Sequence, residues 1–210
     1  MKNIYILSEK PFQNAKNLPC ILIKQIYKDI DFSKYEALVF TSKNGVLAAD
    51  HISKKWKDIP SYSIGSGTSK AIKELGGKLE FEAKNSYGDK FASEIKERLH
   101  GKKVLFLRAK VVTSKLNSIL KEAGVLLDEE IVYETVCNEC ENLKKPESGS
   151  CIVFSSPSTI ECFFRCFEWD SSYKAVVIGD VTKKTMPKGV PYILSEKTTI
   201  PSCIETCLKT

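Results

Sequence analysis

Two segments in the first half of the chain reappear, in the same order, 114 residues later. ALVFTSKNGV (37–46) matches CIVFSSPSTI (151–160), and YSIGSGTSKAI (62–72) matches VVIGDVTKKTM (176–186). Two independent matches at one offset indicate a duplicated structural unit. This duplication limits the folds open to the chain more than any other feature of the sequence.

The rest of the repeat lies at the opposite end of the chain. KKVLFLRAK (102–110) matches KNIYILSEK (2–10). One copy is therefore continuous over residues 33–137, whereas the other is divided between residues 1–28 and 148–210. The sequence thus predicts a discontinuous first domain into which a second domain is inserted.

A chain that leaves one domain, completes the other and returns must cross between them twice. We expect these crossings at residues 29–36 and 134–148. Residues 138–150, which overlap the second of them, contain Pro, Gly, Ser and several charges, a composition typical of linkers. The predicted architecture is two α/β domains joined by a two-stranded connection, with a cleft between them.

Each copy alternates short apolar strands with amphipathic helices. The β-rich run 37–42 precedes Val46, Ala49 and Ile52, which are spaced as on one face of a helix. This alternation is typical of parallel sheets with helices on both faces, so the predicted fold class is two doubly wound, flavodoxin-like α/β domains. Ligands of such sheets bind beyond the carboxyl ends of the strands. Residues 9–20, between the first two strands, leave room only for a short or irregular helix.

Four loops that open predicted helices are rich in Gly, Ser and Thr. They are FTSKNG (40–45) and IGSGTS (64–69) in one copy, and FSSPST (154–159) and IGDVTK (178–183) in the other. The N–H groups and the dipole at a helix N-terminus bind carboxylates or phosphates. The candidate binding residues are Thr41, Ser42, Lys43, Gly65, Ser66, Thr68, Ser155, Ser156, Ser158, Gly179 and Thr182. Ser and Thr are also good N-caps, so capping alone is the alternative interpretation.

The charge pattern argues against a nucleic acid as the ligand. The net charge is +6, from 32 Lys and Arg against 26 Asp and Glu, but the only arginines are Arg98, Arg108 and Arg165. Nucleic-acid-binding proteins usually cluster their basic residues, whereas these lysines are spread along the chain. A solvated, Lys-rich surface explains the charge, and a mild positive field that attracts a polyanionic small molecule is the alternative.

The sequence also predicts where the protein works and the state of its cysteines. The chain has no run of 18 apolar residues, so no membrane-spanning helix is expected. Its first residues indicate a strand rather than a signal peptide, which predicts a cytoplasmic protein. The eight cysteines are then expected to be reduced thiols that fill helix faces. Zinc is the alternative, although His51 and His100 lie far from any cysteine in the sequence.

Motifs for a strong catalytic base or nucleophile are absent from the sequence. Neither GxGxxG, GxxxxGK[ST] nor GxSxG occurs, so dinucleotide binding is only weakly indicated and no metal site is apparent. An enzyme of this kind would work by positioning and hydrogen bonding. Tyr133, on the strand that begins the return crossing, is the most suggestive side chain. Its hydroxyl points into the cleft in one interpretation, and its ring packs under the connection in the other.

Taken in order, six segments resemble the uroporphyrinogen-III synthase family over about residues 37–186: LVFTSKNGV, YSIGSGTSKAI, VLFLRAK, IVYETV, IVFSSPSTI and VVIGDVTKKTM. The resemblance implies an enzyme of tetrapyrrole biosynthesis that converts hydroxymethylbilane, a linear tetrapyrrole with eight carboxylates, into uroporphyrinogen III. One water is lost and ring D is inverted, so the implied enzyme is a carbon–oxygen lyase of the hydro-lyase type. It further implies two α/β domains, no cofactor and a monomer. The upstream bilane-making enzyme is then a natural transient partner.

The resemblance also carries roles to individual positions. The family's tyrosine in the VYxT strand corresponds to Tyr133, our candidate proton donor, and its arginine after the LFLR strand corresponds to Arg108. Its threonine and serine loops correspond to Thr41, Ser42, Thr68, Ser155, Ser156, Ser158 and Thr182. Many bacterial members place an arginine after the first strand. Here Ser8 and Lys10 occupy that loop, so we expect Lys10 or Lys43 as a substitute, without the bidentate fork of an arginine.

Two other functions stay open at this point. The first is a non-catalytic, hinged-cleft protein that binds an anionic small molecule. The second is an enzyme that handles phosphosugars with the same Ser- and Thr-rich loops.

Overall fold

A computed structural model describes residues 3–26, 28–84 and 87–210; residues 1–2, 27 and 85–86 lie outside the description. Within these described ranges, no helix is both long enough and apolar enough to cross a membrane.

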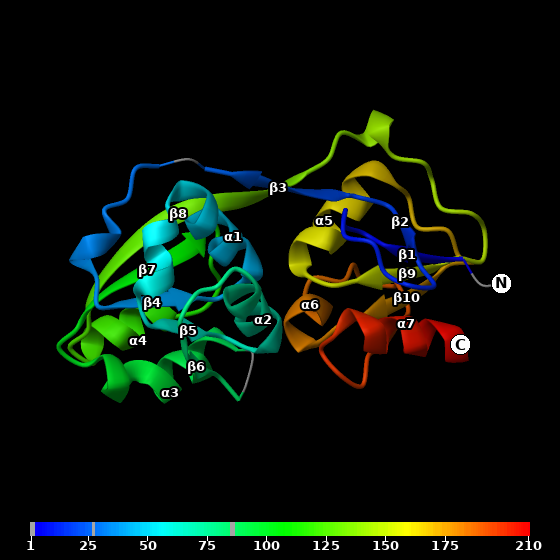
Figure 1. Ribbon diagram of the computed structural model, residues 1–210. Helices are drawn as coiled ribbons and strands as arrows, with labels where there is room; N and C mark the ends of the chain where they lie inside the picture. Colours follow the sequence, from blue (N-terminus) through cyan, green and yellow to red (C-terminus); the bar gives the residue numbers. More distant parts are fainter. Residues whose placement is uncertain (1–2, 27, 85–86) are drawn as a thin grey trace. The chain divides into compact units, whose positions relative to one another are not determined.

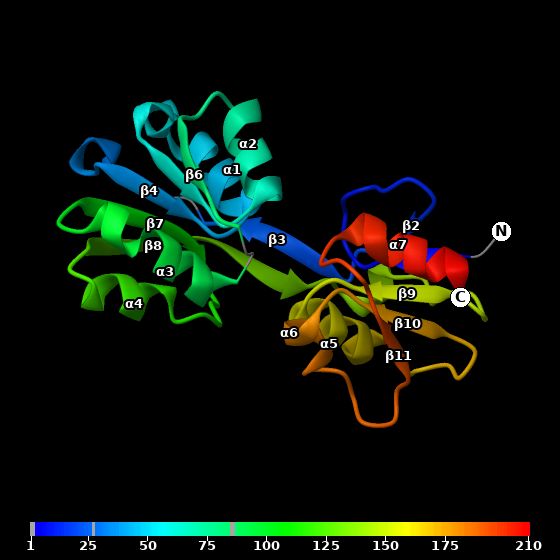
Figure 2. The same cartoon turned by 90° about the horizontal axis from the view of Figure 1, so that it is seen from below.

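The chain divides into two compact units, each of which is visible in Figures 1 and 2. Unit 1 contains residues 1–22 and 135–210, and unit 2 contains residues 23–134. The chain therefore passes between the units at residues 22–23 and 134–135. The segment 29–36, where we expected the first crossing, lies wholly within unit 2.

Unit 2 is built on a six-stranded sheet in the order β3-β8-β7-β4-β5-β6. Its strands are β3 (Ile21–Gln25), β4 (Ala37–Phe40), β5 (Ser61–Ser63), β6 (Leu79–Glu82), β7 (Lys103–Ala109) and β8 (Leu126–Cys137). Its helices are α1 (Lys43–Ile52), α2 (Ser66–Glu74), α3 (Gly88–Leu99) and α4 (Leu116–Glu122), with 3-10 turns η1 (Phe32–Lys34) and η2 (Lys54–Asp58). Neighbouring strands are parallel from β8 through to β6.

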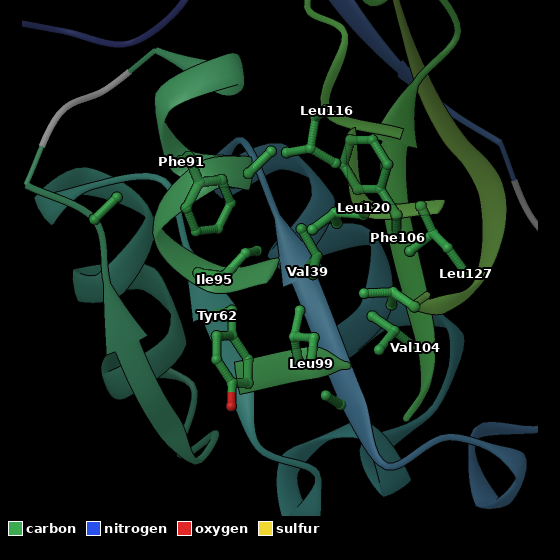
Figure 3. Packing of buried hydrophobic residues seen from close by; sticks show 14 residues of the cluster. Val39, Tyr62, Phe91, Ile95, Leu99, Val104, Phe106, Leu116, Leu120 and Leu127 are labelled. Atoms are coloured by element: carbon green, nitrogen blue, oxygen red, sulfur yellow. The ribbon is translucent and has the colours of Figure 1, made fainter. Parts of the chain in front are cut away.

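Helices cover both faces of this sheet because its central strands are apolar on both sides. Val39 of β4 and Phe106 of β7 pack in one buried cluster with side chains from α3 and α4. Figure 3 shows these helices over the two strands. Leu38 and Leu107 point to the other face and pack in a cluster with α1 and α2. Successive strand residues alternate between two cores, which is the pattern of a doubly covered parallel sheet.

Unit 1 has a five-stranded sheet in the order β11-β10-β9-β1-β2, and every neighbouring pair is parallel. Its strands are β1 (Ile4–Ile6), β2 (Lys16–Asn17), β9 (Cys151–Phe154), β10 (Lys174–Val177) and β11 (Tyr192–Leu194). Its helices are α5 (Pro157–Cys166), α6 (Asp180–Lys183) and α7 (Ile200–Lys209), with the 3-10 turn η3 (Cys140–Asn142). α5 packs on one face of the sheet and α7 on the other. The prediction of an α/β fold with parallel sheets is confirmed.

The two units repeat one arrangement of strands and helices. β4 and β9 begin and end 114 residues apart, as do α1 and α5. The order β11-β10-β9-β1-β2 in unit 1 corresponds to β6-β5-β4-β7-β8 in unit 2. Counted along the chain, unit 1 has the flavodoxin order 2-1-3-4-5. The five parallel strands of unit 2 have the order 3-2-1-4-5, because the split copy begins at a different strand.

β3 and β8 form an antiparallel ladder that contains both passages of the chain between the units. Ile26 N–H donates to the Val132 carbonyl in unit 2, and Asn138 N–H donates to the Cys20 carbonyl in unit 1, each at 2.9 Å. At the N-terminus, the segment between β1 and β2 contains no helix among its residues, all of which are described. Asn17 Nδ2 holds this segment by donating to the carbonyls of Ser8 and Lys10, at 2.6 and 2.8 Å.

Cysteines depart from the sequence-based prediction. All eight lie in the described ranges, and six form the disulfides Cys137–Cys162, Cys140–Cys166 and Cys151–Cys207. The prediction of reduced thiols is therefore wrong for these six; only Cys20 and Cys203 are free, and both are buried. Cys162 and Cys166 lie one turn apart on α5 and face two cysteines at the end of β8 and in η3. The paired cysteines are 25, 26 and 56 residues apart, so their spacing in the sequence does not indicate which of them pair.

A thiol count tests the three disulfides. Protein purified without reductant and unfolded in guanidinium is expected to react with two equivalents of Ellman's reagent, from Cys20 and Cys203. Fully reduced protein, the control, gives eight. Closing loops of about 25 residues also stabilises a fold by about 3 kcal/mol each, so reductant should lower the unfolding midpoint. Eight reactive thiols in the untreated protein would contradict the pairing.

Gly45 allows α1 to approach β7 closely. A Cβ atom at this position would lie 2.8 Å from the Leu107 carbonyl oxygen, nearer than such atoms approach in real structures. Gly67 in α2 is the contrasting case, because a Cβ atom there meets nothing within 4 Å.

Gly45→Ala is therefore expected to destabilise unit 2 by about 1–3 kcal/mol, since the methyl group overpacks a backbone contact. Gly67→Ala, the matched control, should be neutral or stabilising by about 0.5 kcal/mol, because alanine favours helix. Urea unfolding followed by circular dichroism measures both. Equal midpoints for the two variants would show that the α1–β7 contact tolerates a side chain.

Candidate functional site

The loop after β4 begins α1 and contains three predicted binding residues. Ser42 is the N-cap of α1, and its Oγ accepts a hydrogen bond from Asn44 N–H at 3.1 Å. Thr41 is half-buried and Lys43 is exposed. The Ser42 hydroxyl thus serves its own helix, as the capping interpretation expects, while Thr41 and Lys43 lie at the carboxyl end of the strand.

Tyr133 lies on β8, two strands from β4, and its side chain contacts Ser42. Its ring is buried, 6% exposed, in the cluster that contains Leu107 and Val46. Its hydroxyl hydrogen-bonds with the Ser42 side chain. Burial raises the pKa of the Tyr133 hydroxyl above its usual 10.0, and the Ser42 contact offsets this only in part. The phenol is therefore protonated at neutral pH and can donate a proton.

A β-bulge gives Tyr133 this direction. Arg108 is in register with Ile131, but the next residue, Ala109, is in register with Tyr133, so Val132 is an extra residue in β8. A bulge of this kind turns the following side chains of the strand to the opposite face. Tyr133 consequently faces α1, whereas Arg108 faces α4 on the other side of the sheet.

Arg108 makes a partly buried ion pair that sequence reasoning missed. Its Nε lies 2.8 Å from Glu129 Oε2, and the two side chains are 22% and 17% exposed. Glu129 Oε1 also accepts from Lys121 Nζ at 3.1 Å and from Asn117 Nδ2 at 3.4 Å. Burial alone would raise the pKa of Glu129, but these bonds and the nearby guanidinium outweigh it and lower the pKa.

The loop after β5 offers backbone groups at the start of α2. Gly65 is the N-cap, and its carbonyl accepts from Thr68 N–H at 3.0 Å. Ser66 is exposed at the first helical position, whereas Thr68 is buried, 6% exposed. The loops after β4, β5 and β7 lie at the same end of the sheet, because these strands are parallel.

Unit 1 repeats these features at the carboxyl ends of β9 and β10. Ser156 caps α5 in a reciprocal arrangement with Thr159, whose side chain accepts from Ser156 N–H at 3.1 Å. Ser155 and Ser158 are half-buried beside it. The loop after β10 places Gly179 at the N-cap of α6 and buries Thr182.

Lys10 lies in the loop after β1, where the family resemblance predicts an arginine. The Lys10 side chain is exposed, with its Nζ 5.6 Å from the centroid of the Phe12 ring. Over residues 3–26, 28–84 and 87–210, no group of three or more His, Cys, Asp or Glu side chains is arranged to hold a metal ion.

In each sheet the polar loops flank the place where successive helices change faces. In unit 2 this place lies between β4, followed by α1, and β7, followed by α4. Ligands of open parallel sheets bind at such switch points. The structure therefore brings Ser42 and Tyr133 together on one side of the sheet and places Arg108 on the other.

Comparison with known proteins shows to which family the chain belongs. Residues 10–205 match the profile described as uroporphyrinogen-III synthase HemD. This chain belongs to the uroporphyrinogen-III synthase family. The match includes the loops after β4 and β5 in unit 2 and after β9 and β10 in unit 1.

Individual family members resemble the chain to different extents. It is 30% identical over 192 residues to the porphyrin biosynthesis protein HemD of Ruminiclostridium josui, covering 84% of this chain but only 38% of that relative's length. It is 25% identical over 181 residues to the uroporphyrinogen-III synthase of Chlorobaculum parvum, covering 75% of this chain and 72% of that protein.

Solved structures of the family share the fold. The crystal structure of uroporphyrinogen-III synthetase from Helicobacter pylori 26695 has a TM-score of 0.84 and 27% identity, covering 100% of this chain and 99% of that chain. A mutant uroporphyrinogen III synthase from Thermus thermophilus has a TM-score of 0.57 at 12% identity, covering 93% of this chain and 88% of that chain. The second likeness concerns the fold alone.

Proposed function

We propose that this chain cyclises hydroxymethylbilane to uroporphyrinogen III, with loss of one water and inversion of ring D, as a hydro-lyase of tetrapyrrole biosynthesis. Membership of the uroporphyrinogen-III synthase family supports the reaction. The single structural observation that carries the proposal is the repeated set of polar loops at the carboxyl ends of both parallel sheets. Each unit supplies its own amide and hydroxyl donors to a substrate with eight carboxylates.

The proposed chemistry begins at the hydroxyl group of ring A. This hydroxyl takes up a proton and leaves as water, which produces an azafulvene cation. The substituted carbon of ring D attacks the cation and forms a spiro pyrrolenine. Fragmentation and reclosure then invert ring D, and the proton that ring D loses on reclosure balances the one taken up by the leaving group.

Tyr133 is our candidate for the proton donor. Its raised pKa keeps the hydroxyl protonated at neutral pH, as an acid must be, and its contact with Ser42 places it beside the loop after β4. The loop amides and hydroxyls bind the carboxylates and hold the bilane so that ring D is presented to ring A. Because closure without enzyme gives the uninverted type I ring, binding energy from several carboxylates must direct the folding of the substrate.

The reaction is tested with bilane generated in situ by a bilane-making enzyme. After addition of the purified protein and oxidation, chromatography separates type I from type III uroporphyrin. We expect mainly type III product. Type I alone, formed at the rate seen without protein, would overturn the synthase proposal and favour a binding protein of the same fold.

Tyr133→Phe is expected to lower kcat by about 100-fold while changing KM less than threefold, because general acid catalysis contributes about 100- to 10,000-fold. Tyr62→Phe is the matched control: Tyr62 is also buried in unit 2, 3% exposed, but it packs on the α3 side of the sheet. An unchanged kcat in Tyr133→Phe would remove Tyr133 from the chemistry. In the wild type, loss of the acid should appear only as the pH rises above 10, since the pKa of Tyr133 is raised.

Location and assembly belong to the same proposal. We propose a cytoplasmic monomer that receives its unstable substrate from the upstream bilane-making enzyme. Three disulfides are unusual in a reducing compartment. The thiol count described above therefore also tests the proposed location when the protein is alkylated inside the cells before lysis. Disulfides found in such protein would count against the cytoplasm.

A further inference from the structure

A pocket of about 370 Å³ lies in unit 2 beyond the carboxyl end of β7. Its polar lining includes Arg108, Lys110, Ser114, Asn117 and Glu129, and its apolar lining includes Phe106 and Val111. It opens on the α4 side of the sheet, whereas Tyr133 and Ser42 lie on the α1 side. It is therefore separate from the proposed proton donor, although both belong to one end of one sheet.

The guanidinium group of Arg108 is held in a fixed position in this pocket. Its Nε is paired with Glu129 at 2.8 Å, and its Nη1 donates to the carbonyls of Ala109 and Lys110 at 3.0 and 3.3 Å. Glu129 and the two backbone carbonyls thus hold the guanidinium group at Nε and Nη1.

The lining carries more positive than negative charge. Arg108 and Lys110 contribute two cations against the single carboxylate of Glu129, and that carboxylate is shared with Lys121. Lys110 also pairs with Glu134 at 2.9 Å, where its side chain is 61% exposed and able to exchange partners. An anion that enters the pocket meets two cations and an apolar wall.

The volume limits what the pocket can hold. Ligand pockets of proteins usually measure about 300–1,000 Å³, so a pocket of 370 Å³ fits a small ring with side chains but not a tetrapyrrole. A substrate with eight carboxylates on four rings carries two carboxylates on each ring. Two cations beside apolar side chains match one such ring.

We propose that this pocket binds one pyrrole ring of the bilane, with Arg108 and Lys110 holding its two carboxylates and Glu129 acting as the positioning residue for Arg108. The inference rests on the proposed function, which supplies the substrate class. It adds Lys110, Asn117 and Glu129 to the residues that determine which substrates bind.

A charge placed at the pocket mouth tests the proposal without disturbing the fold. Val111 lines the pocket and is 79% exposed, so Val111→Glu adds a carboxylate where a ligand carboxylate would enter. We expect KM to rise about tenfold, with kcat within twofold of wild type, because like charges repel the substrate in the complex. Leu126→Glu is the matched control: Leu126 is 61% exposed at the opposite end of β8 and outside the pocket. Equal KM values for the two variants would overturn the proposal.

The role of Glu129 is tested by a double-mutant cycle with Arg108. Arg108→Gln is expected to raise KM at least tenfold, the loss of a charge-assisted hydrogen bond. Glu129→Gln should raise KM several-fold in the wild type but cause no further rise when Arg108 is already Gln. Additive effects on KM would show that Glu129 does not act through Arg108. Melting temperatures of the four proteins separate a loss of stability from a loss of binding.

A binding measurement keeps failure of the pocket distinct from failure of the reaction. Uroporphyrin III, which carries eight carboxylates, serves as a fluorescent probe in titrations of wild type, Val111→Glu and Leu126→Glu. Weaker binding in Val111→Glu alone supports the pocket even if no type III product forms, an outcome that would overturn only the reaction. Type III product together with identical affinities in all three proteins would overturn the pocket and leave the reaction standing.

Discussion

A parallel sheet must be covered on both faces, and the rest of this structure depends on that requirement. β4 and residues 104–107 of β7 alternate their apolar side chains between two cores, and these segments contain no polar side chain. The polar groups of the candidate site are therefore confined to the end of the sheet where β4 and β7 finish, in the loops there and in Arg108 and Tyr133 beside them. Because the whole unit is duplicated, the same confinement occurs in both sheets, at loops 114 residues apart.

A single extra residue in β8 decides the chemistry at the end of the sheet in unit 2. Val132 is the residue that the register skips, and Tyr133 is turned toward α1 as a result. In a regular ladder Tyr133 would face α4, on the same side as Arg108. The bulge instead places a phenol with a raised pKa in an apolar environment and leaves the guanidinium beside Glu129. Two different polar environments are thereby built on opposite faces of adjacent strands.

Unit 1 has the same arrangement of parallel strands as unit 2 but fewer helices around it. The segment between β1 and β2 has none, whereas the corresponding position in unit 2 carries α4. Three disulfides lie in this unit, where they tie β8 and η3 to α5 and tie β9 to α7. Cross-links of this kind stabilise a fold whose core is small, mainly by constraining the unfolded chain.

The sequence by itself determined those features that arise from residues close together in the chain or from the internal repeat. Helical and strand periodicities, the offset of 114 and the polar loops predicted an α/β fold with parallel sheets, and the order of the motifs indicated the family. Only the tertiary structure decided the cysteine pairing, the bulge at Val132 and the pairing of Arg108 with Glu129. Each of these joins residues more than 20 positions apart, and which of them meet depends on strand register and helix packing. Periodicity along one segment carries no information about either.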